Sequence, residues 1–173
     1  MELLERRLLH HINRRLDTLS DAVVINQAAT TISEITEKPI LKTLPKETVQ
    51  DFKDFDQTLS NNEESLLHVV HFMHLYAARA KSANVAIGII LPRIIKKEVQ
   101  LKYSKAGIPF HGISKENFSA TTTFKSLERV LLDVFKNETQ KTIGTAVSRW
   151  LSNAVDREGG KKKRMQENAR QAE

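Results

Sequence analysis

The N-terminal part of the chain carries a leucine-rich pattern that predicts a long helix built to pair with another helix. Neither proline nor glycine occurs from Glu2 to Ser33, and apolar residues recur at alternating spacings of three and four. That spacing places them in one seam along a helix, as in a coiled coil. The seam consists of Leu9, Ile12, Leu16, Leu19 and Val23. We expect residues 1–35 to form a coiled-coil-like arm through which the chain self-associates; the alternative is an amphipathic helix folded back on its own domain.

Residues 36–60 are predicted to form a linker followed by a short helix. Two prolines lie in the segment 36–46, where they interrupt regular structure. Proline is favoured in the first turn of a helix, so we expect a helix to begin near Pro45 and to end near Leu59.

The middle of the chain contains two strongly apolar segments that predict core helices. Asn61 or Asn62 caps the first helix, which runs to about Lys81, because an asparagine oxygen accepts a hydrogen bond from a backbone N–H group of the first turn. The second helix starts at Asn84 and contains VAIGIILPRIIKKEVQLKY. Pro92 lies inside it and is expected to kink or split it.

The C-terminal part combines a long loop, two helices and a tail. Residues 104–122 contain two glycines and a proline and have no helical period, which predicts a long functional or flexible loop. Amphipathic helices are expected over 124–135 and 138–155. The fold class is therefore all-α, with one compact helical domain over 61–158 and a basic, disordered tail over 159–173.

The composition suits one soluble globular unit. Of the 173 residues, 40% are hydrophobic and 28% are charged, which is enough apolar material for a packed core. The sequence contains no cysteine, so disulfides and cysteine-ligated metals are excluded. Its longest apolar stretch is far shorter than the roughly 20 residues that span a bilayer, so we expect no membrane partner.

The charge of the chain is unevenly distributed. Residues 1–60 carry 8 basic and 10 acidic side chains, whereas residues 61–173 contain the whole basic excess behind the net charge of +6. A basic excess of this kind favours a polyanionic partner such as nucleic acid; a basic solvated surface is the alternative.

One face of the last predicted helix has the composition of a DNA-contacting surface. Its apolar residues fall on one side at about 100° per residue and are expected to be core; they are Ile143, Val147, Trp150, Leu151 and Ala154. The opposite side carries small hydroxyl residues flanked by two cations. This polar stripe consists of Lys141, Thr145, Ser148, Arg149 and Ser152. Short side chains allow close approach to the major groove, and arginine can bind guanine bidentately. The pattern predicts contact with duplex DNA; a plain solvated face is the alternative.

Further cations lie near this helix in the sequence. The basic run directly after Gly159 and Gly160 consists of Lys161, Lys162, Lys163 and Arg164. Such a run can neutralise phosphates, serve as a nuclear import signal or solubilise the terminus, and we expect a nuclear protein. Lys102 and Lys105 are predicted to add phosphate contacts if they lie on the same side as the last helix.

Neither a metal site nor an active site is predicted. His68, His71 and His74 are three residues apart on one helix, a spacing that turns each by about 60° relative to the last. They cannot converge on one ion, so we expect partly buried or interface histidines and no cofactor. The sequence has no glycine-rich phosphate loop, GxSxG, HExxH or paired-carboxylate motif, so we expect no enzyme and no small-molecule substrate.

Three segments in order resemble a known domain family. They are NVAIGIILPRIIKKEVQLKYSKAG, FKSLERVLLDVF and IGTAVSRWLSNAVDREGGKKKR, and they span roughly residues 60 to 160. Together they resemble the domain-of-unknown-function family 4806, an uncharacterised helical domain of arthropods. The chain departs from that family in one place: the family usually has an aromatic-containing turn such as SWTG and then a short loop, whereas this chain has SKAG followed by the longer IPFHGISKENFSATT.

The order of these features is also similar to that of BEN domains, which are small all-α modules that bind DNA. This resemblance implies that the last helix and the adjoining loops form the contact surface, and therefore that the polar stripe binds DNA. We expect a DNA-binding or chromatin-associated module that acts in transcriptional regulation. The alternative is a protein–protein interaction or assembly module that self-associates through its N-terminal helix and does not bind nucleic acid.

Overall fold

The computed structural model describes residue 14 and residues 32–108, 114–157 and 159. The predicted self-association seam, Leu9 to Val23, lies outside the described residues, and so does the basic run from Lys161 to Arg164.

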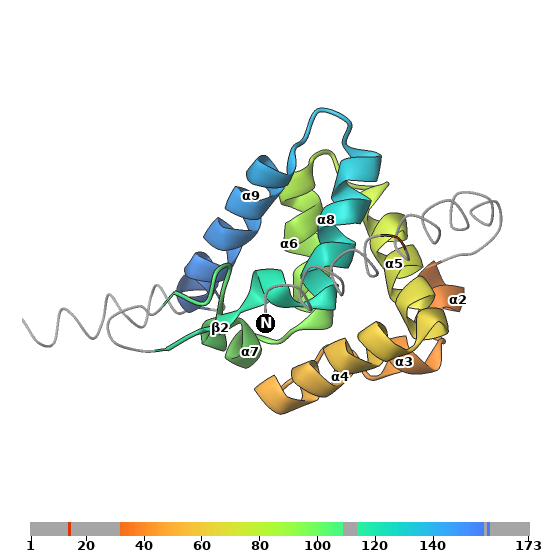
Figure 1. Cartoon of the computed structure of the whole chain (residues 1–173). Helices are drawn as coiled ribbons and strands as arrows, with labels where there is room; N and C mark the ends of the chain where they lie inside the picture. The colour runs from red at the N-terminus through yellow and green to blue at the C-terminus, as the bar shows by residue number, and fades with distance from the viewer. Residues whose placement is uncertain (1–13, 15–31, 109–113, 158, 160–173) are drawn as a thin grey trace, which may run out of the picture.

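Most of the described chain is helical, which confirms the all-α fold class (Figure 1). The elements are α2 (Ile32–Thr36), α3 (Pro39–Lys42), α4 (Val49–Asn61), α5 (Glu63–Ala77), α6 (Ala83–Ile94), α7 (Lys97–Lys102), β1 (Tyr103–Ser104), β2 (Glu116–Asn117), the 3-10 helix η1 (Phe118–Ala120), α8 (Thr122–Val134), α9 (Gln140–Ser152) and the 3-10 helix η2 (Asn153–Asp156). Within these ranges no helix has the length and apolar character that crossing a membrane requires.

Side-chain caps determine where the longer helices begin. In each, a side-chain oxygen of the capping residue accepts a hydrogen bond from the backbone N–H three residues later. The caps are Thr48, Asn62, Ser82, Thr121 and Thr139. The predicted cap at Asn62 is confirmed. The start predicted at Asn84 is wrong by one residue, because the Ser82 hydroxyl caps a helix that begins at Ala83.

The predicted break near Pro92 falls slightly beyond the proline. α6 continues to Ile94, and α7 begins at Lys97. Between them the chain forms a parallel bridge with Lys46: the Lys46 N–H donates to the Ile94 carbonyl at 2.8 Å, and the Lys96 N–H donates to the Lys46 carbonyl at 2.9 Å. These bonds to a distant segment replace helical hydrogen bonds, and the helix ends there.

The core lies between α5, α6, α8 and α9. In Figure 1 α9 lies on one side of α6 and α8, and α5 lies on the other. The inward side chains of these four helices are almost completely buried; examples are Met73, Ile90, Leu127 and Val147. The core therefore joins helices that lie far apart in the sequence.

The segment predicted as a linker lies against this core. α2 and α3 pack on α5, and α4 packs on α5 and α8. Ile35, Leu41, Phe52 and Phe55 are buried. Pro39 begins α3, and Pro45 lies between α3 and α4; neither separates the segment from the rest of the protein. Among the described residues, the compact body therefore includes α2, α3 and α4 as well as the helices after residue 61.

The predicted long loop is held at both ends. β1 pairs in parallel with β2, and Phe118, which follows β2, is completely buried. The centroid of its ring lies 6.0 Å from those of Phe52 and Phe124 and 5.8 Å from that of Tyr103. We call these four residues the aromatic cluster. The predicted long loop therefore contains two short regular elements, β2 and η1, and the cluster fixes the chain around β2.

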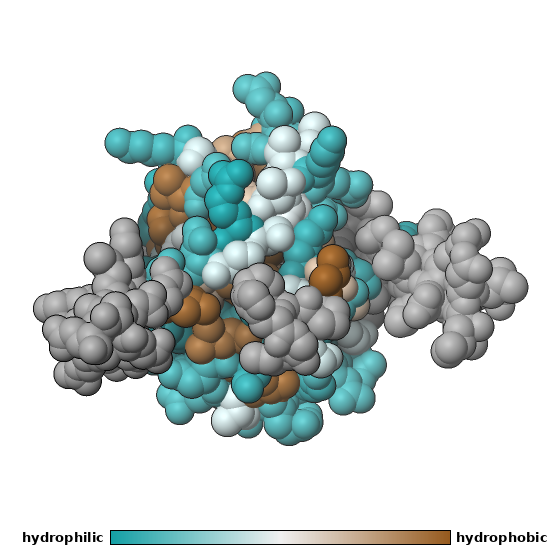
Figure 2. Space-filling model, turned by 90° about the vertical axis from the view of Figure 1, so that its left-hand side faces the viewer, coloured by the Kyte–Doolittle hydropathy of each residue, from teal (hydrophilic) through white to brown (hydrophobic). Residues whose placement is uncertain are grey.

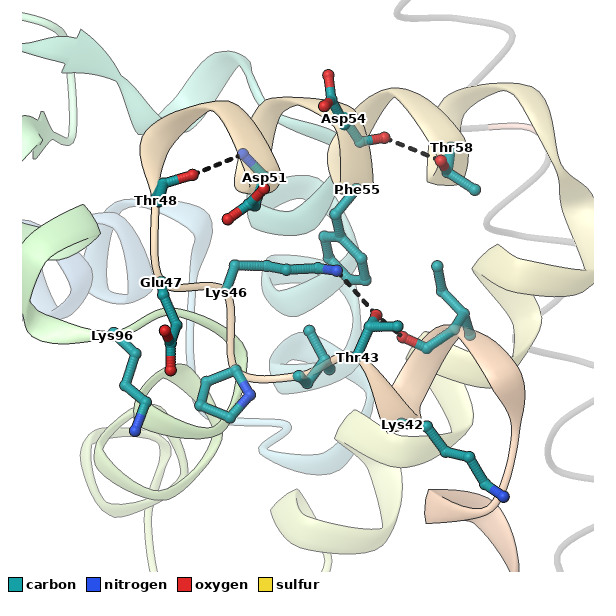
Figure 3. A pocket seen from close by; sticks show the side chains of 13 residues that line it. Lys42, Thr43, Lys46, Glu47, Thr48, Asp51, Asp54, Phe55, Thr58 and Lys96 are labelled. Carbon is teal, nitrogen blue, oxygen red and sulfur yellow. Dashed lines mark hydrogen bonds between the residues drawn. The ribbon is translucent and has the colours of Figure 1, made fainter.

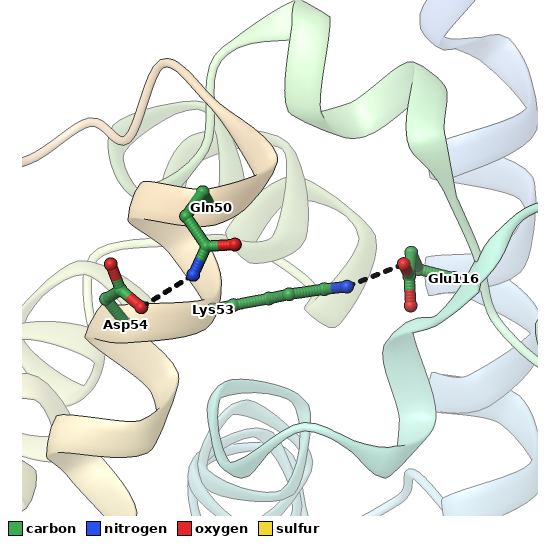
Figure 4. Close-up of polar contacts among 4 residues, drawn as sticks. All are labelled: Gln50, Lys53, Asp54 and Glu116. Carbon is green, nitrogen blue, oxygen red and sulfur yellow. Dashed lines mark hydrogen bonds and ion pairs between the residues drawn. The ribbon is translucent and has the colours of Figure 1, made fainter.

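A half-exposed ion pair also links α4 to β2. The Lys53 ammonium lies 2.7 Å from a carboxylate oxygen of Glu116 (Figure 4). On the same face of α4 the Gln50 amide donates to Asp54 at 2.8 Å. Ion pairs with this exposure contribute at most about 1 kcal/mol, so burial of Phe118 dominates the anchoring.

A carboxylate from α4 holds the start of α8. Asp56 accepts hydrogen bonds from the backbone N–H groups of Thr122 and Thr123 at 3.0 and 2.8 Å, and from the Thr123 hydroxyl at 2.6 Å. The first N–H groups of a helix lack partners within the helix, and a negative charge there also interacts favourably with the helix dipole. Asp56 therefore fixes α8 relative to α4.

Candidate nucleic-acid interface

α9 presents the polar stripe as the sequence pattern predicted. Ile143, Val147 and Leu151 are buried in the core, and Gly144 is buried as well. Lys141, Thr145, Arg149 and Ser152 are exposed, and Ser148 is half-buried. The predicted division of this helix into a core side and a polar side is confirmed. In Figure 2 hydrophilic side chains cover most of the face that includes α9, with small apolar areas between them.

Both ends of α9 are fixed, so the stripe has a rigid support. At the start Thr139 and Thr142 form a capping box. After α9 the chain forms η2, and the next residue, Arg157, accepts a hydrogen bond at its carbonyl from the Lys97 ammonium and donates from its guanidinium to Gln100. The guanidinium also lies 3.8 Å from the centroid of the Trp150 ring, a cation–π contact. Trp150, which the pattern assigned to the core, is therefore only partly buried.

The structure brings Lys105 to the polar stripe. An open hollow of about 410 Å³ is lined by Lys105, Gly144, Thr145, Ser148, Arg149 and Ser152. Lys105 is the residue directly after β1, and its side chain extends to the hollow. Its ammonium nitrogen lies 2.7 Å, and its Cε 2.9 Å, from where a Cβ at position 144 would stand. Only glycine leaves that space free, so the absence of a side chain at Gly144 allows the Lys105 ammonium to lie there.

Glu128 of α8 interacts electrostatically with the seated lysine. Burial raises the pKa of the Glu128 carboxyl, and the nearby Lys105 ammonium opposes that rise. The carboxylate offsets part of the lysine charge and favours a position of the ammonium close to the protein surface.

Two of the three hydroxyl groups of the stripe are oriented by hydrogen bonds to the helix itself. The Thr145 hydroxyl donates to the Lys141 carbonyl, and the Ser152 hydroxyl donates to the Ser148 carbonyl, both at 2.9 Å. A hydroxyl that donates to its own helix presents lone pairs to the outside. Among the side chains that line the hollow, Lys105, Arg149 and the Ser148 hydroxyl therefore supply hydrogen-bond donors to an anion, and the first two also supply positive charge.

Not all the predicted contact residues gather at this hollow. Lys141 and Lys102 are exposed, but neither lines it. Sequence reasoning missed Gly144 and Glu128. A glycine inside an amphipathic helix costs about 1 kcal/mol relative to alanine, so its presence at position 144 was a signal of close approach by another group.

A second, larger hollow of about 570 Å³ lies beside the start of α4 (Figure 3). Its lining mixes cations with carboxylates: Lys42, Lys46 and Lys96 with Glu47, Asp51 and Asp54. The Lys46 ammonium donates to the Thr43 hydroxyl at 2.8 Å and lies 5.4 Å from the centroid of the Phe55 ring. Burial lowers the pKa of Lys46, while Asp51 and Asp54 oppose the shift. The carboxylates would repel a polyanion, so the hollow beside α9 is the better nucleic-acid site.

Two of the three histidines on α5 are buried without a hydrogen-bond partner at Nε2. His71 is 9% exposed and His74 4%. Burial lowers the pKa of both side chains; His68 adds to the effect at His71, whereas Asp133 opposes it at His74. In the described part of the chain no group of three or more histidine, cysteine or acidic side chains could hold a metal ion.

Because His71 and His74 are buried, we expect the free energy of unfolding to decrease in mild acid. The unfolded chain binds protons at about pH 6.5, whereas the folded protein binds them only at lower pH. The stabilising contribution is therefore complete above about pH 6.5 and is lost as the pH falls toward the folded pKa values. Urea unfolding followed by circular dichroism between about pH 7.5 and 5.5 measures this. The double variant His71→Leu/His74→Leu should show a flatter dependence, and an unchanged slope would contradict the assignment.

The chain has no significant match among models of protein families, curated proteins or solved structures. The resemblance to the arthropod family and to BEN domains therefore stays a prediction. The case for a function is made by the geometry around α9.

Proposed function

We propose that the protein binds duplex DNA through α9 and Lys105, and that it acts as a nuclear, chromatin-associated module in transcriptional regulation. The observation that carries the proposal is the meeting of Lys105 and Arg149 at one hollow. Lys105 follows β1 and Arg149 belongs to α9, and both line a hollow that also includes small hydroxyl side chains of α9. A polyanion gains from such an arrangement because each neutralised phosphate releases condensed counterions.

The support beneath these cations favours the same function. α9 is capped at its start, held at its end by Lys97 and Gln100, and packed against α6 and α8. A rigid helix that presents short side chains can approach a duplex closely, and the cations need not be ordered at much entropic cost. The basic excess after residue 60 adds long-range attraction toward DNA.

Replacing Arg149 by alanine is expected to weaken binding to a mixed-sequence duplex about tenfold. A plot of the logarithm of the binding constant against the logarithm of salt concentration has a negative slope. If the lost contact is to a phosphate, that slope should become shallower by about 0.9. Fluorescence anisotropy of a labelled duplex across a salt series measures both quantities.

Lys42→Ala is the matched control, because Lys42 lies on α3, away from α9 in Figure 1, and is an exposed cation paired with Glu37. It removes the same charge and should change the affinity much less. Equal losses in the two variants would point to net charge alone. If the wild-type protein has negligible affinity at low salt, the proposed function is wrong, and assembly through the N-terminal seam becomes the better hypothesis.

A further inference from the structure

We infer that the hollow beside α9 holds one phosphate group of the DNA backbone between Lys105 and Arg149, with Gly144 as the residue that positions the lysine. The inference rests on the proposed function and makes it more specific. At this point α9 would lie along the sugar–phosphate backbone, and the hollow would contribute affinity without regard to base sequence.

The recessed position of the Lys105 ammonium favours a phosphate over a base. Base edges lie at the floor of a groove, so the side chains that bind them must protrude from the protein. Lys105 is half-buried, and its ammonium lies against the surface of α9 over Gly144. Phosphate groups project outward from a duplex and can enter a hollow that a stacked base cannot reach.

The chemistry of the lining agrees with this ligand. A phosphate accepts hydrogen bonds and donates none, so it needs donors and positive charge. Lys105 and Arg149 supply both, and an ammonium is a point charge that binds phosphate without selecting a base. The Thr145 and Ser152 hydroxyls direct their hydrogens to helix carbonyls, which leaves the two cations and the Ser148 hydroxyl as donors in the lining.

Gly144 offers a way to displace the cation without removing any charge. A Cβ at this position would stand 2.7 Å from the ammonium nitrogen and 2.9 Å from Cε. These atoms are the flexible end of the lysine side chain, so the fold need not change when they move away. Alanine also favours the helix by about 1 kcal/mol relative to glycine. Gly144→Ala should therefore keep the protein folded while the Lys105 ammonium is displaced from its position over Gly144.

The test compares full-length wild-type protein with Gly144→Ala on a G·C-rich and an A·T-rich duplex, by fluorescence anisotropy across a salt series. We expect affinity to fall about fivefold on both duplexes, and the salt dependence to become shallower by about one unit of slope. The melting temperature should stay the same or rise. Gly88→Ala is the matched control, because Gly88 is an exposed glycine on α6 with nothing within 4 Å of an added Cβ.

The outcomes separate this inference from the proposed function. Loss of affinity on one duplex only would show that the hollow contacts bases. Unchanged affinity of Gly144→Ala would show that the position of Lys105 over Gly144 does not contribute to DNA binding. Either result overturns the phosphate site and leaves DNA binding standing. If wild-type protein binds neither duplex at low salt, the proposed function and the phosphate site are both wrong.

Discussion

Replacing Phe118 by alanine is expected to lower the free energy of unfolding by about 3–5 kcal/mol. The ring is completely buried, and it contacts Phe52, Tyr103 and Phe124 from three different elements. Its removal leaves a cavity that those three aromatic rings can fill only partly. Urea unfolding followed by far-ultraviolet circular dichroism measures the loss.

Ile108→Ala is the matched control in the same part of the chain. Ile108 is 67% exposed, so truncating it should change the free energy of unfolding by less than about 0.5 kcal/mol. Phe118→Leu, which keeps most of the volume, should lie between the two. If Phe118→Ala were as stable as the wild-type protein, the aromatic cluster would not be the anchor of the loop.

Replacing Asp56 by alanine is expected to cost about 3 kcal/mol of stability. The change leaves three donors at the start of α8 without their acceptor: two backbone N–H groups and the Thr123 hydroxyl. Thr122 and Thr123 are buried, so water cannot fully replace the carboxylate, and each unsatisfied donor costs about 1–3 kcal/mol. Thermal and urea unfolding of the variant measure the effect.

Asp54→Ala is the control that distinguishes loss of the hydrogen bonds at the start of α8 from loss of one negative charge on α4. Asp54 lies on the same helix but is exposed, and it accepts a hydrogen bond from Gln50 within α4. Its removal should cost less than about 0.5 kcal/mol. Similar losses for Asp54→Ala and Asp56→Ala would contradict the role of Asp56 at the start of α8.

Local sequence patterns predict the helices of this protein well. The division of α9 into a core side and a polar side follows from the spacing of Ile143, Val147 and Leu151, and the cap at Asn62 follows from its side chain. Both depend on residues within one or two helical turns. Such local interactions can be recognised in a sequence without knowledge of the fold.

Contacts between distant segments account for what the sequence did not reveal. The loop around Phe118 has no helical period, because its order comes from aromatic rings on α4, β1 and α8. Similarly, no local pattern places Lys105 over Gly144 of α9. The candidate site could therefore be predicted only in part: the stripe follows from helical periodicity, whereas the lysine that completes the hollow depends on the tertiary fold.

The aromatic cluster also has a consequence for the synthesis of the chain. Phe52 is made long before Phe118, the ring on which it stacks. At roughly 5–20 residues per second, translation leaves several seconds during which α4 has emerged but Phe118 has not. For that time the phenylalanine side of α4 is exposed on the nascent polypeptide, so α4 is the segment that we expect chaperones to protect during translation.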